Sequence, residues 1–254
     1  MEEIKPTQVR NDFSKVVGAY TKYRRDYIDK VYELIYSFCP DRESNVLDVG
    51  CGTGFVTNHL AGYYKHITGT DKSQEMLEVA KSVGPDNTSF VIASTEELLF
   101  ENDSFDLATA AAAYHWFDYD KAGKEIYRVL KPNGKLCVFW KYAPGDFGGY
   151  LPEFAIENLR HFVSDIPKTN KEPISRDVFL RVGFTKVDVK EFDFDDPYSK
   201  EEILGYIQSH STFNLLNDEQ KEEYKKLNEE SVGKYLKDDK FIFKSRMEIW
   251  FIEK

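Results

Sequence analysis

The chain has 254 residues, 41% hydrophobic and 31% charged, so it can form a packed core and wholesale disorder is excluded. Its formal net charge is −10 and no basic run offsets it, so neither a nucleic acid nor an anionic membrane is an expected partner. The N-terminus has no apolar leader, and the longest nearly apolar run, Leu107–Phe117, is too short to span a bilayer. The three cysteines are widely spaced, which argues against a disulfide framework. We therefore expect a soluble, reduced, cytoplasmic protein.

Strands and helices alternate along the first 140 residues or so. Short apolar runs predict five strands, and apolar residues at helical spacing predict the helices, with Ser73 as the N-cap of one of them. The predicted helices are Thr7–Tyr20, Tyr27–Phe38, Gly54–Tyr63, the helix after Ser73, and Asp118–Leu130; the predicted strands are Asn45–Gly50, His66–Thr70, Phe90–Ala93, Phe105–Ala112 and Lys135–Trp140.

After Trp140 the alternation loosens, although two further strands and four helices are predicted. Strands that alternate with helices favour βαβ units, and therefore an α/β fold with a mainly parallel sheet covered by helices on both faces. No clean linker divides the chain, so we expect one domain over residues 1–254. The later helices are Glu153–Val163, Ser175–Val182, Ser199–His210 and Asp218–Leu236, and the later strands are Val187–Phe194 and Lys244–Ile252.

The strongest pattern is a glycine loop that follows the first predicted strand. Gly50, Gly52 and Gly54 alternate where a buried strand turns into a helix, which suits positive φ and the close approach of a ligand to the backbone. Asp71, 21 residues past Gly50, is placed to bind ribose hydroxyls. Phe55 stands where a dinucleotide fingerprint requires its third glycine, and the P-loop sequence is missing, so both motifs are excluded. A tight turn without a ligand is the alternative.

Four ordered motifs over about residues 45–140 resemble those of class I S-adenosylmethionine (SAM)-dependent methyltransferases of the type 11 domain. The resemblance implies a Rossmann-like, mainly parallel sheet of seven strands, with the last strand antiparallel and helical insertions capping the site. The matching segments are Leu47–Gly54 for motif I, Asp71–Leu77 for Asp-x-Ser-x-x-Met-Leu, Phe105–Leu107 for the start of strand four, and Arg128–Leu136 for the Arg-x-Leu-Lys-Pro-Gly-Gly turn.

Two further segments are similar to trans-aconitate methyltransferase-like proteins. Phe13, Ala19–Tyr20 and Tyr23–Arg24 resemble an N-terminal element of that subfamily, with Arg25 in place of its proline. Ala113–Asp118 resembles the His-Trp-Phe segment that follows strand four in these proteins. This similarity implies a small carboxylic acid as the methyl acceptor.

The resemblance also implies roles at a SAM site, with S-adenosylhomocysteine (SAH) as product. The three glycines would bring backbone against the methionine part of SAM, Asp48 would orient its ammonium, and Asp71 would accept the ribose hydroxyls. Ser94 stands where relatives carry an Asp that binds the adenine amine, so Ser94 and Thr95 would take over that contact. The predicted donor-binding residues are Asp48, Gly50, Cys51, Gly52, Gly54, Asp71, Lys72, Ser73, Met76, Ser94, Thr95 and Ala111.

His115 is the predicted catalytic residue, and a structural histidine that buttresses the pocket is the alternative. Segment 1–40 would form an N-terminal lid beside a donor-binding core over residues 45–140, and insertions 143–182 and 199–238 would cover the acceptor. The aromatic content of 15% suits such a cover. The predicted acceptor contacts are Tyr20, Tyr23, Arg24, Trp116, Trp140 and Lys141.

We therefore expect a SAM-dependent methyltransferase of a small molecule, with a trans-aconitate-like carboxylate as the first acceptor class. A phenol, quinone or amine acceptor is the alternative within the enzyme class, and a non-catalytic SAM- or SAH-binding sensor or partner subunit is the alternative outside it. The histidines and cysteines show no ligand spacing, so no metal is expected. The acidic run Glu191–Asp196 is interpreted as an exposed strand edge.

Overall fold

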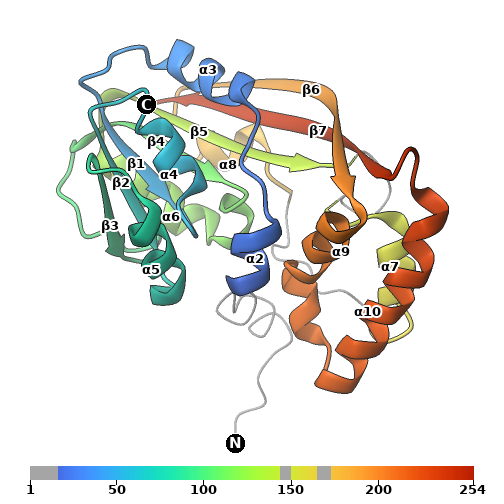
Figure 1. Ribbon diagram of the computed structural model, residues 1–254. Helices are drawn as coiled ribbons and strands as arrows, with labels where there is room; N and C mark the ends of the chain where they lie inside the picture. The colour runs from blue at the N-terminus through green and yellow to red at the C-terminus, as the bar shows by residue number, and fades with distance from the viewer. Residues whose placement is uncertain (1–16, 144–149, 165–172) are drawn as a thin grey trace, which may run out of the picture. The chain divides into compact units, whose positions relative to one another are not determined.

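A computed structural model describes residues 17–143, 150–164 and 173–254 of the protein (Figure 1). The chain divides into two compact units. The first unit comprises Met1–Arg25, Lys141–Thr169 and Phe192–Met247, and the second comprises Asp26–Trp140, Asn170–Glu191 and Glu248–Lys254. The predicted core 45–140 belongs to the second unit, whereas the predicted lid 1–40 and insertion 143–182 each contain a boundary between units. The prediction of one domain therefore stays a prediction.

The described strands form a seven-stranded sheet of order β3-β2-β1-β4-β5-β7-β6. The pairs β3–β2, β2–β1, β1–β4 and β4–β5 are parallel, whereas β7 is antiparallel, so the predicted Rossmann-like fold is confirmed. The strand order reverses between β1 and β4, where open α/β sheets form their ligand crevice. The strands are β1 (Asn45–Val49), β2 (His66–Asp71), β3 (Thr88–Ile92), β4 (Phe105–Ala111), β5 (Leu130–Tyr142), β6 (Lys186–Ser199) and β7 (Lys240–Glu253).

Helices cover both faces of the sheet in the second unit. On one face, Leu47 and Ala108 belong to a buried cluster with Ile126 of α6 and Phe179 of α8. The helices of the chain are α2 (Val17–Tyr23), α3 (Asp29–Phe38), α4 (Phe55–Leu60), α5 (Gln74–Val83), α6 (Tyr119–Val129), α7 (Glu153–Leu159), α8 (Arg176–Leu180), α9 (Lys200–Gln208) and α10 (Asp218–Val232), with short 3₁₀ helices η2 (Tyr114–Trp116), η3 (Ser211–Leu215) and η4 (Gly233–Tyr235).

Polar side chains cap the N-termini of two helices that follow strands of the sheet. The Ser73 hydroxyl accepts the backbone N–H of Met76 over 3.3 Å, which confirms Ser73 as the N-cap of α5. The Asp118 carboxylate accepts the N–H of Lys121 over 3.1 Å and caps α6 in the same way. These two caps begin the helices that follow β2 and β4, and so place the loops at the carboxyl edge of the sheet.

Several predicted boundaries differ from the structure. β5 begins at Leu130 instead of Lys135, because the predicted break forms an irregularity in the pairing with β4: Phe105 pairs with Leu130 and Leu107 already pairs with Lys135. β6 extends to Ser199, beyond the predicted end at Phe194. Most of the predicted helix Thr7–Tyr20 lies outside the described residues, and α2 continues to Tyr23.

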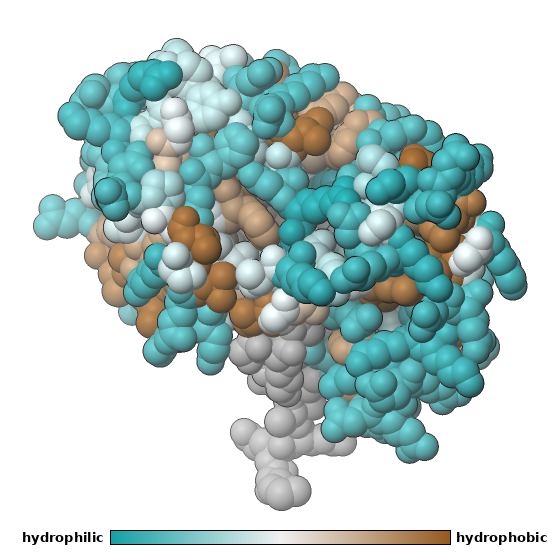
Figure 2. All heavy atoms as spheres, in the orientation of Figure 1, coloured by the Kyte–Doolittle hydropathy of each residue, from teal (hydrophilic) through white to brown (hydrophobic). Residues whose placement is uncertain are grey.

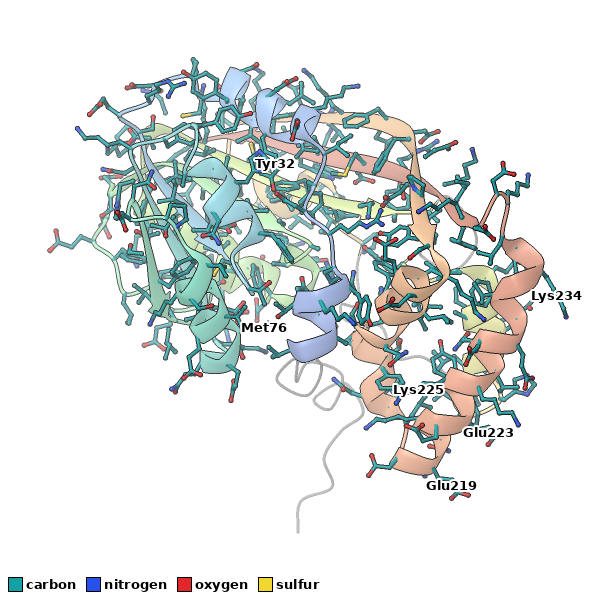
Figure 3. All side chains as sticks on the ribbon, in the orientation of Figure 1. Tyr32, Met76, Glu219, Glu223, Lys225 and Lys234 are labelled. Carbon is teal, nitrogen blue, oxygen red and sulfur yellow. The ribbon has the colours of Figure 1, made fainter. Side chains whose placement is uncertain are left out.

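The first unit has its own apolar cluster, formed by α7, α9, α10 and the strand ends that belong to it. Capping boxes at Ser199 and Asn217 start α9 and α10, and the buried Tyr224 hydroxyl donates to the Ala155 carbonyl over 3.0 Å. Figure 3 shows Glu219 and Glu223 on the outer side of α10, and Figure 2 shows the mainly hydrophilic surface that such residues make. None of the helices in the described ranges is long and apolar enough to cross a bilayer.

Candidate active site

The glycine loop after β1 has the backbone conformation that its sequence predicts. Gly50, Gly52 and Gly54 have φ values of 65°, 55° and 84°, in the left-handed region that favours glycine. A Cβ on Gly50 would lie 2.7 Å from the Cβ of Ala113, and a Cβ on Gly54 would lie 3.0 Å from the Cβ of Ala80. A Cβ on Gly52 would meet no described atom within 4 Å. The loop therefore packs at both ends and exposes its backbone to open space at Gly52.

Asp71 ties this loop to the next helix. One carboxylate oxygen accepts the N–H of Gly52 over 3.0 Å, and the other accepts the N–H of Ser73 over 2.9 Å. Burial raises the pKa of the Asp71 carboxyl, and the two N–H donors and the charge of Lys72 oppose that rise. Each oxygen keeps a second lone pair, so the carboxylate can accept two ligand hydroxyls as well.

Asp48 lies in the sheet beneath the loop, with only 1% of its surface exposed. The Thr57 hydroxyl of α4 donates to one carboxylate oxygen over 2.7 Å, and the Thr109 hydroxyl of β4 donates to the other over 2.8 Å. Burial raises the pKa of Asp48 to about 6, although both hydroxyls favour the ionised form. Asp48 thus joins β1, β4 and α4, and its predicted contact with a ligand ammonium stays a prediction.

Two buried hydroxyls beside the loop fit a polar ligand. Thr53 Oγ1 in the loop and Thr70 Oγ1 at the end of β2 are buried and have no hydrogen-bond partner among the described residues. A buried polar group left unpaired costs about 1–3 kcal/mol, so such groups usually mark a water or a ligand. Cys51 has its N–H bonded to the Thr70 carbonyl over 2.9 Å, and burial raises its thiol pKa well above the usual value. The Cys51 thiol is therefore not a nucleophile near neutral pH.

The predicted adenine-side residues flank the ends of β2 and β3. Met76 is buried on α5, and Lys72 is exposed beside it. Thr95 is buried, whereas Ser94 is exposed and donates its hydroxyl to Glu96. These residues line the same edge of the sheet as Asp71, since β2 and β3 are parallel neighbours.

The segment after β4 packs directly on the loop. Ala111 ends β4, Ala112 has φ of 48°, and the next residues form the 3₁₀ helix that carries His115 and Trp116. A Cβ on Gly50 would also lie 3.1 Å from the Phe117 ring. The rings of His115 and Trp116 are partly exposed, with centroids 5.1 Å apart. The fold therefore brings the segment that carries His115 to the glycine loop, through Ala113 and Phe117 on either side of it.

The predicted acceptor residues divide between the two units. Trp116 and Trp140 belong to the second unit, and Trp140 stacks on Trp250 with centroids 6.5 Å apart. Tyr20, Tyr23, Arg24 and Lys141 belong to the first unit. The Tyr23 hydroxyl donates to Glu201 over 3.2 Å.

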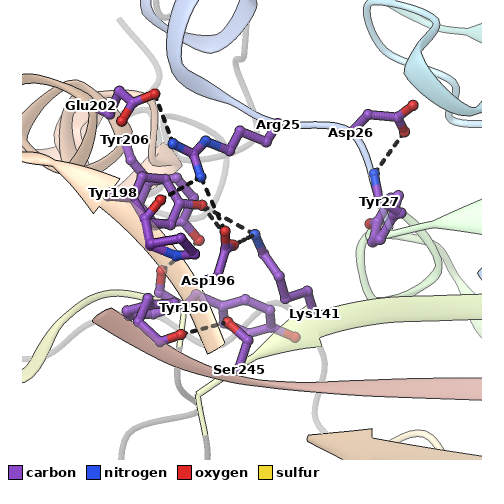
Figure 4. Close-up of polar contacts among 12 residues, drawn as sticks. Arg25, Asp26, Tyr27, Lys141, Tyr150, Asp196, Tyr198, Glu202, Tyr206 and Ser245 are labelled. Carbon is purple, nitrogen blue, oxygen red and sulfur yellow. Dashed lines mark hydrogen bonds and ion pairs between the residues drawn. The ribbon is translucent and has the colours of Figure 1, made fainter. Parts of the chain in front are cut away.

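Arg24 and Lys141 lie in a polar cluster of the first unit that also contains tyrosines, part of which Figure 4 shows. Arg24 Nε donates to Ser209 Oγ over 2.9 Å, and its guanidinium lies 4.6 Å from the Tyr206 ring centroid. Lys141 Nζ donates to Asp196 over 2.6 Å and to the Tyr198 hydroxyl over 3.1 Å. Burial lowers the pKa of the Lys141 ammonium, and the Asp196 charge opposes the shift.

Sequence reasoning missed Asp196 as part of this cluster. The side chain of Asp196 is 12% exposed, and it pairs with both Arg25 and Lys141, so the expected exposed edge is wrong at this residue. Asp193 and Asp195 do keep exposed side chains, which pair with Arg246 and Lys244. No spacing signal joins positions 25, 141 and 196, because they come from three distant segments. Among the described residues, no group of three or more His, Cys, Asp or Glu is arranged to hold a metal ion.

The sheet order, the antiparallel β7 and the loop after β1 define the class I methyltransferase fold. The profile of the type 11 family described as "Methyltransferase domain" matches residues 47–138. An uncharacterized methyltransferase of Schizosaccharomyces pombe is 30% identical over 217 residues, which cover 83% of this chain and 82% of that protein. The chain belongs to the SAM-dependent methyltransferase family, and it is a methyltransferase.

Two other similarities agree with this membership. A putative methyltransferase of Dictyostelium discoideum is 33% identical over 137 residues, and this match covers 54% of the chain and 51% of the length of that protein. The crystal structure of the YcgJ protein of Bacillus subtilis has a TM-score of 0.58 and 23% identity, covering 88% of this chain and 98% of that one. The second similarity concerns the fold alone. Binding of SAM and SAH is typical of the family.

Proposed function

We propose that this enzyme transfers a methyl group from SAM to a carboxylate of a small organic acid. The donor half of the proposal is supported by the glycine loop, which exposes backbone at Gly52, and by Asp71, which keeps free lone pairs beside it. Bound SAM supplies an electrophilic methyl group on a sulfonium. The chain's contribution is to orient acceptor and donor and to exclude water, which is worth up to about 7–11 kcal/mol in well-oriented systems.

Each predicted donor residue has a proposed task that its position permits. The loop from Gly50 to Gly54, with Cys51, holds the methionine part, Asp48 fixes the base of that loop, and Asp71 accepts the ribose hydroxyls. The residues proposed to flank the adenine and the sulfur side are Lys72, Ser73, Met76, Ser94, Thr95 and Ala111.

The observation that carries the carboxylate class is an excess of positive charge among the described side chains of the polar cluster in the first unit. Arg25 pairs with Asp196 and Glu202, and Lys141 pairs with Asp196. Arg24 forms no ion pair with a carboxylate in the described part of the chain. Among the described side chains of this cluster, Arg24, Arg25 and Lys141 carry three positive charges, whereas their two carboxylate partners carry two negative ones. An acceptor with one anionic group would balance this charge.

Arg24 is also prepared for that contact. Its Nε–H is held by the buried Ser209, and the Tyr206 and Tyr20 rings lie 4.6 Å and 5.3 Å from its guanidinium carbon. A guanidinium that is fixed in this way binds a carboxylate through two parallel N–H groups at a reduced entropic cost. Tyr23 and Lys141 are proposed as further acceptor contacts of the first unit, and the roles of Trp116 and Trp140, which belong to the second unit, stay predictions.

A screen with isotopically labelled SAM tests this proposal directly. Small acids, phenols and amines are offered separately, and the products are then treated with mild base. Label that appears on acids and is released by base supports a methyl ester. Base-stable label on a phenol, quinone or amine would contradict the carboxylate class and support the alternative acceptor.

His115 distinguishes the two acceptor classes further. A carboxylate is already an anion and needs no general base, whereas a phenol or amine gains from a base with a pKa near neutral. We expect His115→Ala to lower kcat at least about tenfold with SAM affinity nearly unchanged, and His115→Gln to retain much of kcat because it keeps a hydrogen bond. His66→Ala, an exposed histidine at the start of β2, is the matched control. Unchanged turnover in His115→Ala would return His115 to a structural role.

A further inference from the structure

A second polar network of the second unit lies outside the predicted donor residues. Asp26 Oδ1 accepts the Tyr32 hydroxyl of α3 and also the Tyr27 backbone N–H, the latter over 2.7 Å. Asp26 Oδ2 lies 2.8 Å from Nδ1 of His59 on α4. The Tyr32 and His59 rings stack with centroids 3.6 Å apart and an angle of 6° between their planes. We call Asp26, Tyr32 and His59 the Asp26 clamp.

The clamp is more than a surface ion pair. Tyr32 is fully buried, and the side chains of Asp26 and His59 are 33% and 27% exposed. Burial raises the pKa of the Tyr32 phenol, and the Asp26 charge raises it further, so the hydroxyl remains a donor. An ionised carboxylate only accepts, so His59 Nδ1 carries the proton that faces Asp26. Three donors therefore hold one carboxylate.

The residue that follows Asp26 packs near the carboxyl edge of the sheet. Tyr27 follows Asp26, and its ring packs edge-on against Phe139 of β5 with centroids 5.0 Å apart. Phe139 pairs with Ala111, a predicted donor-binding residue, and its carbonyl accepts the N–H of Ala112 over 2.8 Å. A shift of Asp26 would therefore move a side chain that packs next to the end of β4.

The clamp residue His59 lies on α4, the helix that begins at the glycine loop. Gly54 is the N-cap of α4, and two side chains of this helix bond to carboxylates: Thr57 to Asp48 and His59 to Asp26. The Asp48 charge also contributes to the raised pKa of Tyr32, so both carboxylates act on the same buried ring. Helix α4 is thus fastened to β1 at one point and to residue 26 at another.

We propose that the Asp26 clamp positions the donor site: it holds α4, and with it the glycine loop, in a fixed position relative to the segment that carries Tyr27. This proposal rests on SAM being the donor, as proposed above. A loop that binds through its backbone has to be fixed before the ligand arrives, because ordering it on binding would cost affinity. SAM and SAH share the methionine and ribose groups that this loop would hold, so loss of the clamp weakens both to a similar degree.

Two variants remove one clamp contact each: Tyr32→Phe removes the hydroxyl that α3 contributes, and His59→Ala removes the imidazole that α4 contributes. Tyr64→Phe is the matched control, since it also removes one buried tyrosine hydroxyl, which donates to the Cys39 carbonyl over 2.8 Å instead of to Asp26. His59→Asn is the conservative variant, because its amide N–H can replace Nδ1–H. The readouts are calorimetric affinities for SAM and for SAH, with the thermal midpoint as a measure of stability.

We expect the two clamp variants to weaken SAM and SAH alike by about tenfold, which corresponds to about 1.4 kcal/mol. We expect His59→Asn to recover most of that loss, and Tyr64→Phe to lower the thermal midpoint while both affinities stay within about twofold. Equal affinities in Tyr32→Phe and Tyr64→Phe would overturn the proposal. A loss confined to SAM would overturn it too, because the clamp would then act through charge on the sulfonium. A wild-type chain that binds neither compound would instead contradict the proposed function.

Discussion

Asp71 joins the glycine loop to the first turn of α5 through both carboxylate oxygens. Asp71→Asn replaces one acceptor by an N–H group that faces another N–H, so the loop loses a bond and the ribose loses an acceptor. We expect the affinity for SAM to fall at least about tenfold, measured by titration calorimetry. Asp86→Asn makes the same change at an exposed residue of the same unit and should leave affinity unchanged. Equal affinities in the two variants would remove Asp71 from the donor site.

The raised pKa of Asp48 predicts how the unfolding free energy depends on pH, since burial raises the pKa of this carboxyl to about 6. A carboxyl whose pKa is higher in the folded state binds its proton more tightly there, so its contribution to stability is present at low pH and is lost as pH rises from about 4 to about 6. Asp48→Asn removes this titration. We expect the unfolding free energy of the wild type to fall relative to that of Asp48→Asn by about 1.4 kcal/mol per pH unit in this window.

Urea unfolding of both proteins at a series of pH values measures this difference. Burial also raises the pKa of Asp71, so the variant keeps a slope of the same sign from that residue. The capping N–H of Ser199 and the Arg25 charge lower the pKa of Glu202 to about 2, which gives a loss of stability in acid with the opposite sign. Only the difference between the two proteins therefore reports Asp48, and a constant difference across the window would contradict its raised pKa.

The element proposed to hold the donor is the loop between β1 and α4. Gly52 has a φ of 55°, yet a Cβ there would meet no described atom within 4 Å. Gly52→Ala should cost about 1–2 kcal/mol of stability from the left-handed backbone, and it should weaken SAM by more than tenfold because the methyl occupies the space that the ligand needs. Calorimetry and thermal unfolding measure the two effects.

Gly233→Ala is the control for this prediction. Gly233 also has open space around its Cβ position, but its φ of −56° is helical, so alanine should be neutral or slightly stabilising and affinity should not change. If Gly52→Ala lowers stability but leaves SAM affinity intact, the open space beside Gly52 does not hold the donor.

At the scale of the whole molecule, the two proposed contacts belong to different units and can be tested separately. Arg24 belongs to the first unit, and the glycine loop belongs to the second. We expect Arg24→Gln to raise the KM for an acid acceptor at least about tenfold while the affinity for SAM stays within about twofold, because Arg24 serves the acceptor alone. Lys22→Gln, an exposed cation two residues away, is the matched control. Steady-state kinetics with the acid found in the screen measure both values.

A KM that is unchanged in Arg24→Gln would contradict the proposed anion contact. The net charge of −10 makes this local charge more important, because the molecule as a whole repels an acid and the attraction has to come from nearby cations. Raised salt should therefore increase the KM for the acid acceptor by a smaller factor than it would increase the KM for a ligand that is held only by exposed charges.

The sequence by itself determined the alternation of strands and helices, the fold class and the glycine loop after the first strand. These features depend on neighbours in the chain: apolar spacing, the Ser73 cap and the glycines after β1 all act within a few residues, and the structure confirms the cap and the left-handed glycines. The family resemblance rests on the same local motifs. The acceptor class stays a prediction because no such motif specifies it.

Only the tertiary structure decided which distant side chains share a carboxylate. Asp26 meets His59 across 33 positions, Asp48 meets Thr109 across 61, and Asp196 meets Arg25 across 171. Such pairs form when parallel strands and packed helices bring separate segments together, and they leave no periodicity in the chain. The same reason explains why the exposed edge expected for Glu191–Asp196 is wrong at Asp196 alone: burial depends on what packs against a strand, and one segment does not contain that information.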